Sequence, residues 1–188
     1  MLRVKGGVNA FCPRGSGSLD GEYRKTEDIP METSMETFFT FLIALQFVVI
    51  ALHDLVDIPG WTHGNQVQSV VGRPRLWAIT LVNGIFPGLA VGFAIHFWNA
   101  PKPRFVYDYW VMYCAVTLVS AIAMWYVPYL FGTTEERKLD YSRMYAGTRQ
   151  VLPPNGDNPR PNLLHFCFHV LFVINFVFAL ALYFGSTT

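Results

Sequence analysis

Charge is scarce in this sequence and is confined to a few stretches. Charged residues make up 14% of the 188 residues, whereas soluble domains carry roughly 25%. Almost all of them fall in 1–36, 54–75, 102–108 and 135–160. A bilayer imposes this segregation, because an ion in hydrocarbon costs several kcal/mol while loops carry charge freely. The net charge of +1 gives no reason to expect nucleic acid as a partner.

The sequence also lacks the patterns of disulfide scaffolds, zinc modules and common catalytic sites. Its three cysteines have no paired spacing, and Cys114 and Cys167 lie in apolar runs, where we interpret them as small buried residues. There is no G-x-S-x-G elbow, no Gly-rich phosphate loop and no H-E-x-x-H. No catalytic residue is therefore assigned, and whether the protein is an enzyme stays open.

The first 34 residues have no apolar segment of the kind found in a secretory signal. Residues 1–34 are polar, with Gly-Ser-Gly-Ser at 15–18, so we expect a disordered tail. If translation starts at Met31 or Met35, this tail is not part of the protein. The remaining residues, 35–188, are the length of one domain.

Four long apolar runs dominate this domain. They cover 37–55, 76–98, 107–130 and 163–184. At ~1.5 Å per helical residue, each run approaches or exceeds the ~30 Å hydrocarbon core of a bilayer. Trp77 and Trp98 stand at the two ends of the second run, as interfacial tryptophans do. The sequence predicts an all-α integral membrane four-helix bundle, with a short amphipathic surface helix over 133–147 that begins at a capping box of Thr133 and Glu136.

Small residues give the second run a packing face. Gly84, Gly88 and Gly92 recur every four residues, the spacing by which membrane helices bring their backbones together. Pro87 leaves the carbonyl of Asn83 without its usual helical donor, so we expect a kink near the middle of this span.

Four spans place the loops 56–75 and 131–161 on one side of the membrane. Their basic residues are Arg73, Arg75, Arg137, Lys138, Arg143, Arg149 and Arg160. The turn on the opposite side has only Lys102 and Arg104. If the basic residues of the polar tail are included, the two sides of the membrane have equal numbers. Most of those residues, however, lie too far from the first span to count in the positive-inside rule. We expect cytoplasmic loops in a bacterial inner membrane, contact with membrane lipid, and no nucleic acid; a homo-oligomer or larger membrane complex stays open.

Polar residues gather on the loop side of the predicted bundle. They are His53, Asp54, Asp57, His63, Asn162, His165 and His169. The first four follow the first span and the last three begin the fourth, so the topology brings them to one membrane face. Four of the five histidines are among them. Gln46, His53 and Asp57 are spaced seven and four apart, which places them on one stripe of a continuous helix.

Three functions fit this polar cluster. Its side chains can be structural, capping helix ends and tying loops to the bundle. They can hold a metal ion, with His53, His165 and His169 as candidate ligands, or a haem between His53 and His169. They can form a proton-coupled, lipid or quinone pocket, because histidine titrates near neutral pH. No cofactor is assigned. We predict a binding or accessory membrane protein, with a redox or metal-dependent membrane enzyme and a small transporter as alternatives.

Overall fold

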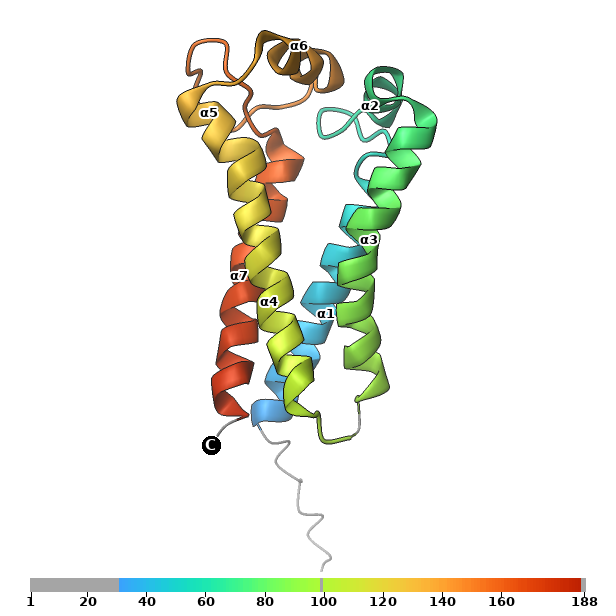
Figure 1. Ribbon diagram of the computed structural model, residues 1–188, viewed down its shortest axis with the longest axis vertical. Helices are drawn as coiled ribbons and strands as arrows, with labels where there is room; N and C mark the ends of the chain where they lie inside the picture. The colour runs from blue at the N-terminus through green and yellow to red at the C-terminus, as the bar shows by residue number, and fades with distance from the viewer. Residues whose placement is uncertain (1–30, 99, 187–188) are drawn as a thin grey trace, which may run out of the picture.

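The structure is a computed structural model that describes residues 31–98 and 100–186, with side chains from Ser34 onward. The tail expected over 1–34 lies almost wholly outside the described residues. Four long helices run along the axis of the molecule, and short helices cover one end (Figure 1). The long helices are α1 (Met31–Leu52), α3 (Arg73–His96), α4 (Arg104–Ala121) and α7 (Leu163–Gly185). The short ones are α2 (Gly64–Val71) and α6 (Glu135–Met144).

Within the described residues, four segments are long and apolar enough to cross a membrane, which confirms the predicted all-α fold. They are Ser34–Leu52, Arg73–His96, Arg104–Phe131 and Leu163–Gly185. The first ends three residues before the predicted boundary at 55. There the hydroxyl of Thr62 donates to the carbonyl of His53 (2.7 Å), and Ile58 pairs with Thr62 in a tight turn. Asp57 therefore lies in a loop, off the helical stripe expected for it.

The helices form two pairs that meet at one end and separate at the other. Helix α1 packs on α3, α4 packs on α7, and the α1–α7 contact joins the two pairs. The short turn between α3 and α4 holds these helices together at one end, whereas they diverge toward the end that bears α2 and α6 (Figure 1). We call these the closed end and the open end.

The closed end has a core of buried aromatic and apolar side chains. Phe39 of α1 and Trp110 of α4 are completely buried and meet edge to face, and the Trp110 indole donates to the carbonyl of Ala90 (3.1 Å). Glu36 accepts from Lys102 Nζ (2.6 Å) and from the hydroxyl of Tyr107 (2.8 Å). This ion pair fastens α1 to the α3–α4 turn.

A buried amide network crosses the middle of the bundle. Gln46 of α1 donates to the hydroxyl of Tyr113 (2.5 Å) on α4, and its oxygen accepts from the amide of Asn175 on α7. All three side chains are buried. The network joins three helices in the middle of the bundle.

The three glycines of the α3 stripe differ in what surrounds them. A Cβ added at Gly84 or Gly88 would lie 3.9 or 3.6 Å from the ring of Phe47 on α1, whereas Gly92 has no neighbour within 4 Å. Pro87 is buried inside α3, which remains one helix from Arg73 to His96. Two of the three glycines therefore lie at the α1–α3 contact.

Helix α4 continues into a π-helical turn that the sequence analysis did not foresee. This turn, η1 (Ile122–Tyr126), leads into α5 (Val127–Phe131). Pro128 has no N–H to give the carbonyl of Met124, so Arg137 Nη2 (3.0 Å) and the hydroxyl of Tyr141 (3.3 Å) donate to it instead. The surface helix α6 thereby holds the widened turn in place.

The loops at the open end contain more order than the sequence predicted. Helix α2 lies within the segment expected to be only a loop, and it packs on α6. The surface helix spans Glu135–Met144, shorter than the expected 133–147. Its N-cap is Thr134, whose hydroxyl accepts from the N–H of Arg137 (3.3 Å). Thr133, the expected cap, stands one residue too early.

Candidate functional site

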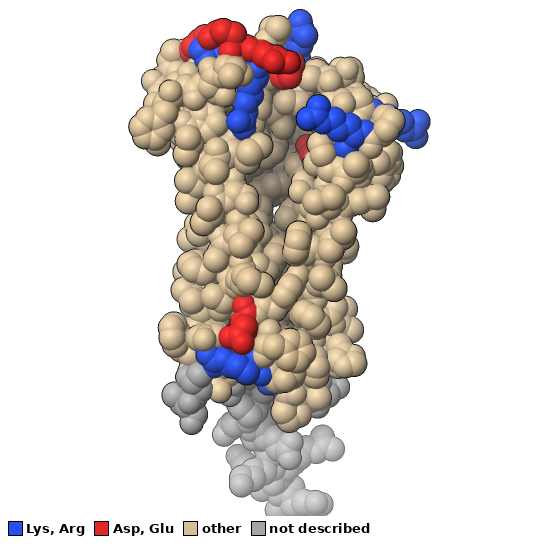
Figure 2. Space-filling view, in the orientation of Figure 1, with Lys and Arg blue, Asp and Glu red and all other residues tan. Residues whose placement is uncertain are grey.

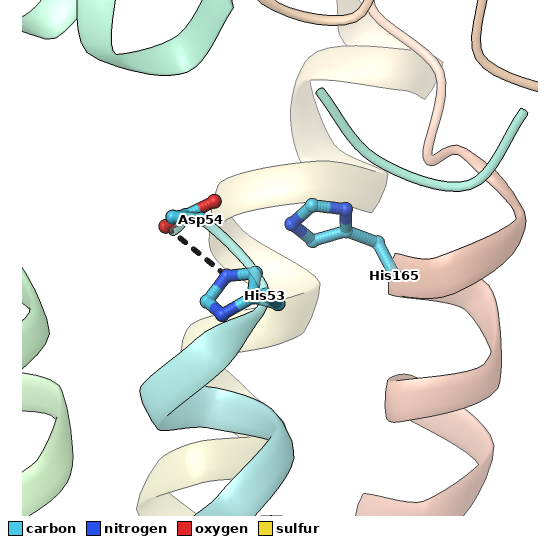
Figure 3. Close-up of side chains that lie close together, drawn as sticks. All are labelled: His53, Asp54 and His165. Atoms are coloured by element: carbon cyan, nitrogen blue, oxygen red, sulfur yellow. Dashed lines mark ion pairs between the residues drawn. The ribbon is translucent and has the colours of Figure 1, made fainter. Parts of the chain in front are cut away.

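His53 is fixed where α1 ends. Its Nδ1 lies 2.9 Å from the carbonyl of Ile50. Because a carbonyl only accepts, Nδ1 carries a proton, so the tautomer with its lone pair on Nε2 is the one that this contact selects. This Nε2 lies 3.2 Å from Oδ2 of Asp54 (Figure 3). Burial raises the pKa of the Asp54 carboxyl above its usual value, while the neighbouring His53 acts in the opposite direction.

His165 is fixed in the same way at the start of α7. Asn162 is the N-cap of that helix, and its Oδ1 accepts the backbone N–H of His165 (3.0 Å). The same oxygen lies 2.8 Å from His165 Nδ1. Nδ1 must therefore donate, and the lone pair is again on Nε2. One helix cap thus sets both the start of α7 and the tautomer of its first histidine.

The two helix ends bring these groups together. Among the described residues, His53, Asp54 and His165 each offer one ligand atom, and these atoms lie within 4.8 Å of one another. Figure 3 shows both rings turned toward the carboxylate, one from α1 and one from α7. The rings of His53 and His165 meet edge to face with centroids 5.4 Å apart. We call these three residues the His–Asp–His trio.

Aromatic side chains from three elements surround the trio. The ring of Trp125, in η1, lies 4.1 Å from that of His165, and Tyr145 follows α6 with its ring 5.3 Å from His165. Phe168 of α7 lies 5.3 Å from His53. Burial, and then the nearby carboxylate, raise the pKa of the Tyr145 phenol well above its usual value, so it remains a neutral hydroxyl.

The other predicted residues lie beside the trio or away from it. His169 lies one turn deeper, where its Nδ1 is 3.1 Å from the hydroxyl of Tyr126. Asp57 accepts from the backbone and side-chain amides of Asn65 and so anchors α2. His63 precedes α2 and lies against the loop that follows α6. The ring contacts of His53 are with His165 and Phe168 rather than with His169, the partner expected in a haem site.

A cleft of about 860 Å³ extends from the trio into the bundle between α3 and α4. Ile79, Val82 and Phe86 line its α3 wall, and Met112 and Val116 line its α4 wall. All five are exposed apolar side chains on spans that are long enough to cross a membrane. Figure 2 shows the hollow between the two helix pairs, with charge gathered at the two ends of this face.

Polar groups are concentrated at one end of the cleft. His53, Asp54, His165, His169 and Tyr145 all line its loop end. No Lys or Arg is among the described residues that line it. The cleft therefore has apolar walls and one polar end, and the described residues that line it include no Lys or Arg.

The sequence does not predict that Trp125 and Tyr145 belong to this site. Trp125 lies in the third apolar run and Tyr145 within the expected surface helix, and neither is among the polar residues that gather on the loop side. The proline at position 128, four residues after Met124, was an available signal of an irregular turn that would reorient Trp125. The spacing of Tyr141 and Tyr145 was a second signal, because i and i+4 share one helix face.

No protein-family model, curated protein or solved structure matches the chain.

Proposed function

We propose that this chain is a multi-pass integral membrane protein that binds a neutral amphiphile of the quinone type in the cleft between α3 and α4. The observation that carries the proposal is the distribution of groups along the cleft: apolar walls along the spans and a polar end beside the loops. This arrangement is complementary to a molecule with an apolar tail and a hydrogen-bonding head.

The position and size of the cleft support an amphiphile from the bilayer. Its walls include exposed apolar side chains of two spans, so a ligand dissolved in the membrane can enter sideways between them. Its volume of about 860 Å³ lies within the roughly 300–1,000 Å³ typical of small-molecule pockets.

The chemistry of the polar end supports a neutral, ring-shaped head. Phosphate heads are usually held by Arg or Lys, and neither is among the described lining residues. The groups present are imidazoles, a carboxyl and the phenol of Tyr145, which exchange hydrogen bonds with carbonyl and hydroxyl oxygens. Trp125 and Phe168 offer faces for stacking. A quinone or quinol matches these groups.

For orientation, we propose that the open end faces the cytoplasm of a bacterial cell. Its loops carry seven basic residues, against Lys102 and Arg104 at the closed end of the described chain. An alkaline phosphatase fused after Thr188 should be active on the non-cytoplasmic side. A phosphatase that is inactive there, while a cytoplasmic reporter at the same position is active, would reverse the orientation.

The binding proposal is tested with decylubiquinone in nanodiscs, with tryptophan fluorescence quenching as the readout. A chelator is present throughout. We expect saturable quenching, because the cleft brings the ligand against Trp125, and little competition from added phosphatidylglycerol. Quenching that rises linearly without saturation, or equal competition by the phospholipid, would overturn the proposal.

Matched variants connect the signal to the cleft. Ser120→Phe fills the cleft from α4, whereas Val119→Phe adds the same ring one residue away, at an exposed position that does not line the cleft. We expect Ser120→Phe to weaken quenching at least ~10-fold and Val119→Phe to match the wild type. Asn83→Phe obstructs the opposite wall and gives an independent reading if Ser120→Phe folds poorly. Equal binding by all three variants contradicts the proposal.

A further inference from the structure

We propose that the His–Asp–His trio binds one divalent transition-metal ion, with open coordination positions facing the cleft. The inference depends on the geometry of the trio and not on binding of an amphiphile. It replaces the ligand set predicted from the sequence, since Asp54 takes the place expected for His169.

The donor chemistry is the first support. In both imidazoles Nδ1 donates a hydrogen bond to an oxygen, so the neutral ring presents its lone pair at Nε2. This is the form of histidine that binds a metal. Asp54 supplies a carboxylate oxygen within 4.8 Å of a ligand nitrogen of each histidine. Two imidazoles and one carboxylate form the ligand set of many zinc and non-haem iron sites, which keep further positions for water or substrate.

The second support is that hydrogen bonds leave part of the trio unsatisfied. One proton between His53 Nε2 and Asp54 Oδ2 would complete a bond across their 3.2 Å separation. His165 has no comparable interaction, because its Nε2 has no hydrogen-bond partner among the described residues. A cation bound to all three atoms satisfies both lone pairs and the carboxylate together.

The distances are close to those that an ion requires. Ligands ~2.1 Å from a tetrahedral ion stand about 3.4 Å apart, and the His53–Asp54 pair already has a comparable separation of 3.2 Å. The three atoms lie within 4.8 Å of one another, so a shift of His165 toward the pair on the order of 1 Å completes the set.

The surroundings of the trio also resemble those of a metal centre. The carbonyl of Ile50 and the side chain of Asn162 orient the two imidazoles from behind, the role that outer ligands have in metal sites. All three members of the trio line the cleft. The remaining coordination positions therefore face a space that water or a ligand can enter.

The test is a Co²⁺ titration of the purified, metal-stripped protein without quinone, followed by visible absorption. We expect saturation at one ion per chain, with d–d bands that Zn²⁺ removes by displacement. Asp54→Asn and His165→Gln should lose the bands, whereas Asp57→Asn and His96→Ala should keep them. Asn162→Ala should weaken binding about 10–100-fold, because it releases the His165 ring.

X-ray absorption of the Zn²⁺-loaded wild type gives a reading that needs no variant. It should show two imidazole ligands and no sulfur. Sulfur ligands, the absence of saturable binding, or unchanged bands in both Asp54→Asn and His165→Gln would overturn the inference. Because the metal is titrated without quinone, and the quinone with a chelator present, each proposal can fail without the other.

Discussion

The two ends of the bundle each contain a carboxylate beside a nitrogen base, and they use it differently. At the closed end, Glu36 accepts from both Lys102 and Tyr107, so each carboxylate oxygen has a donor. At the open end, Asp54 faces His53 and His165, and one of the two Nε2 lone pairs has no partner. A fully satisfied pair stabilises packing, whereas an incompletely satisfied one next to a cleft is available to a ligand.

Breaking the ion pair at the closed end should have the largest effect on stability. Lys102→Met leaves a largely buried carboxylate without its cation and should lower the free energy of unfolding by about 3 kcal/mol. Denaturation by SDS in micelles, followed by circular dichroism, measures the change. Lys138→Met, at an ion pair on the surface, is the control and should lower the free energy of unfolding by a much smaller amount. Equal shifts in the two variants would contradict a structural role for the closed end.

The second largest loss of stability is expected when the amide network in the middle of the bundle is broken. Gln46→Leu removes the partner of Tyr113 and of Asn175 and should cost about 1–3 kcal/mol, because two buried polar groups lose their hydrogen bonds. The same denaturation assay applies. Adding Asn175→Leu should recover part of the loss, since it removes one unsatisfied amide. Additive losses would show that the two amides do not depend on each other.

A smaller effect is expected where α6 supports the π-helical turn. Arg137→Met removes the charged donor to the carbonyl of Met124 and should cost about 1–2 kcal/mol. The turn carries Trp125 against His165, so Co²⁺ affinity should also fall, by less than 10-fold. Arg143→Met, on the exposed side of α6, is the matched control. Loss of stability with unchanged Co²⁺ affinity would show that the π-helical turn does not influence the metal site.

The smallest effect is expected at the exposed rim of the open end. The hydrogen bond from Lys138 lowers the pKa of Asp157 below its usual 3.8. A lowered pKa stabilises the fold above the unfolded value, and this contribution is lost as pH falls through the folded pKa. Asp157→Asn should therefore melt slightly below the wild type at neutral pH; the difference should begin to shrink near pH 3.8 and vanish once the pH is below the lowered pKa of the folded protein. A difference that persists in acid would exclude this ion pair as its cause.

The fold class and the pairing of the site's two halves could be predicted from the sequence. Apolar runs fix the spans, and an even number of spans between His53 and His165 places both on one face. The sequence did not predict the local structure of the turn after α1. Asp57 and His63 lie near the same face, but the turn closed by Thr62 directs Asp57 to Asn65 of α2, and His63 lies against Gly147 in the loop after α6. Hydrophobic periodicity does not contain that information.

A pocket on this face is one of the functions that the sequence suggests, but its α3 and α4 walls and the place of Trp125 could not be predicted, because they depend on contacts between distant segments. The divergence of α3 from α4 follows from how each packs on α1 or α7. The position of Trp125 follows from a π-helical turn whose free carbonyl is satisfied by Arg137, thirteen residues later. The glycine stripe does not show by itself which of its members meet a neighbour: Gly84 and Gly88 lie near Phe47, whereas a Cβ at Gly92 would have nothing within 4 Å.

The most direct test of the contrast between the two ends is photo-cross-linking with a diazirine-bearing quinone analogue in membranes, mapped by mass spectrometry. The account predicts labelling of residues 112–125 and 163–172, which border the cleft, and its suppression by excess decylubiquinone. Competed labelling centred on residues 93–107, at the closed end, would contradict it.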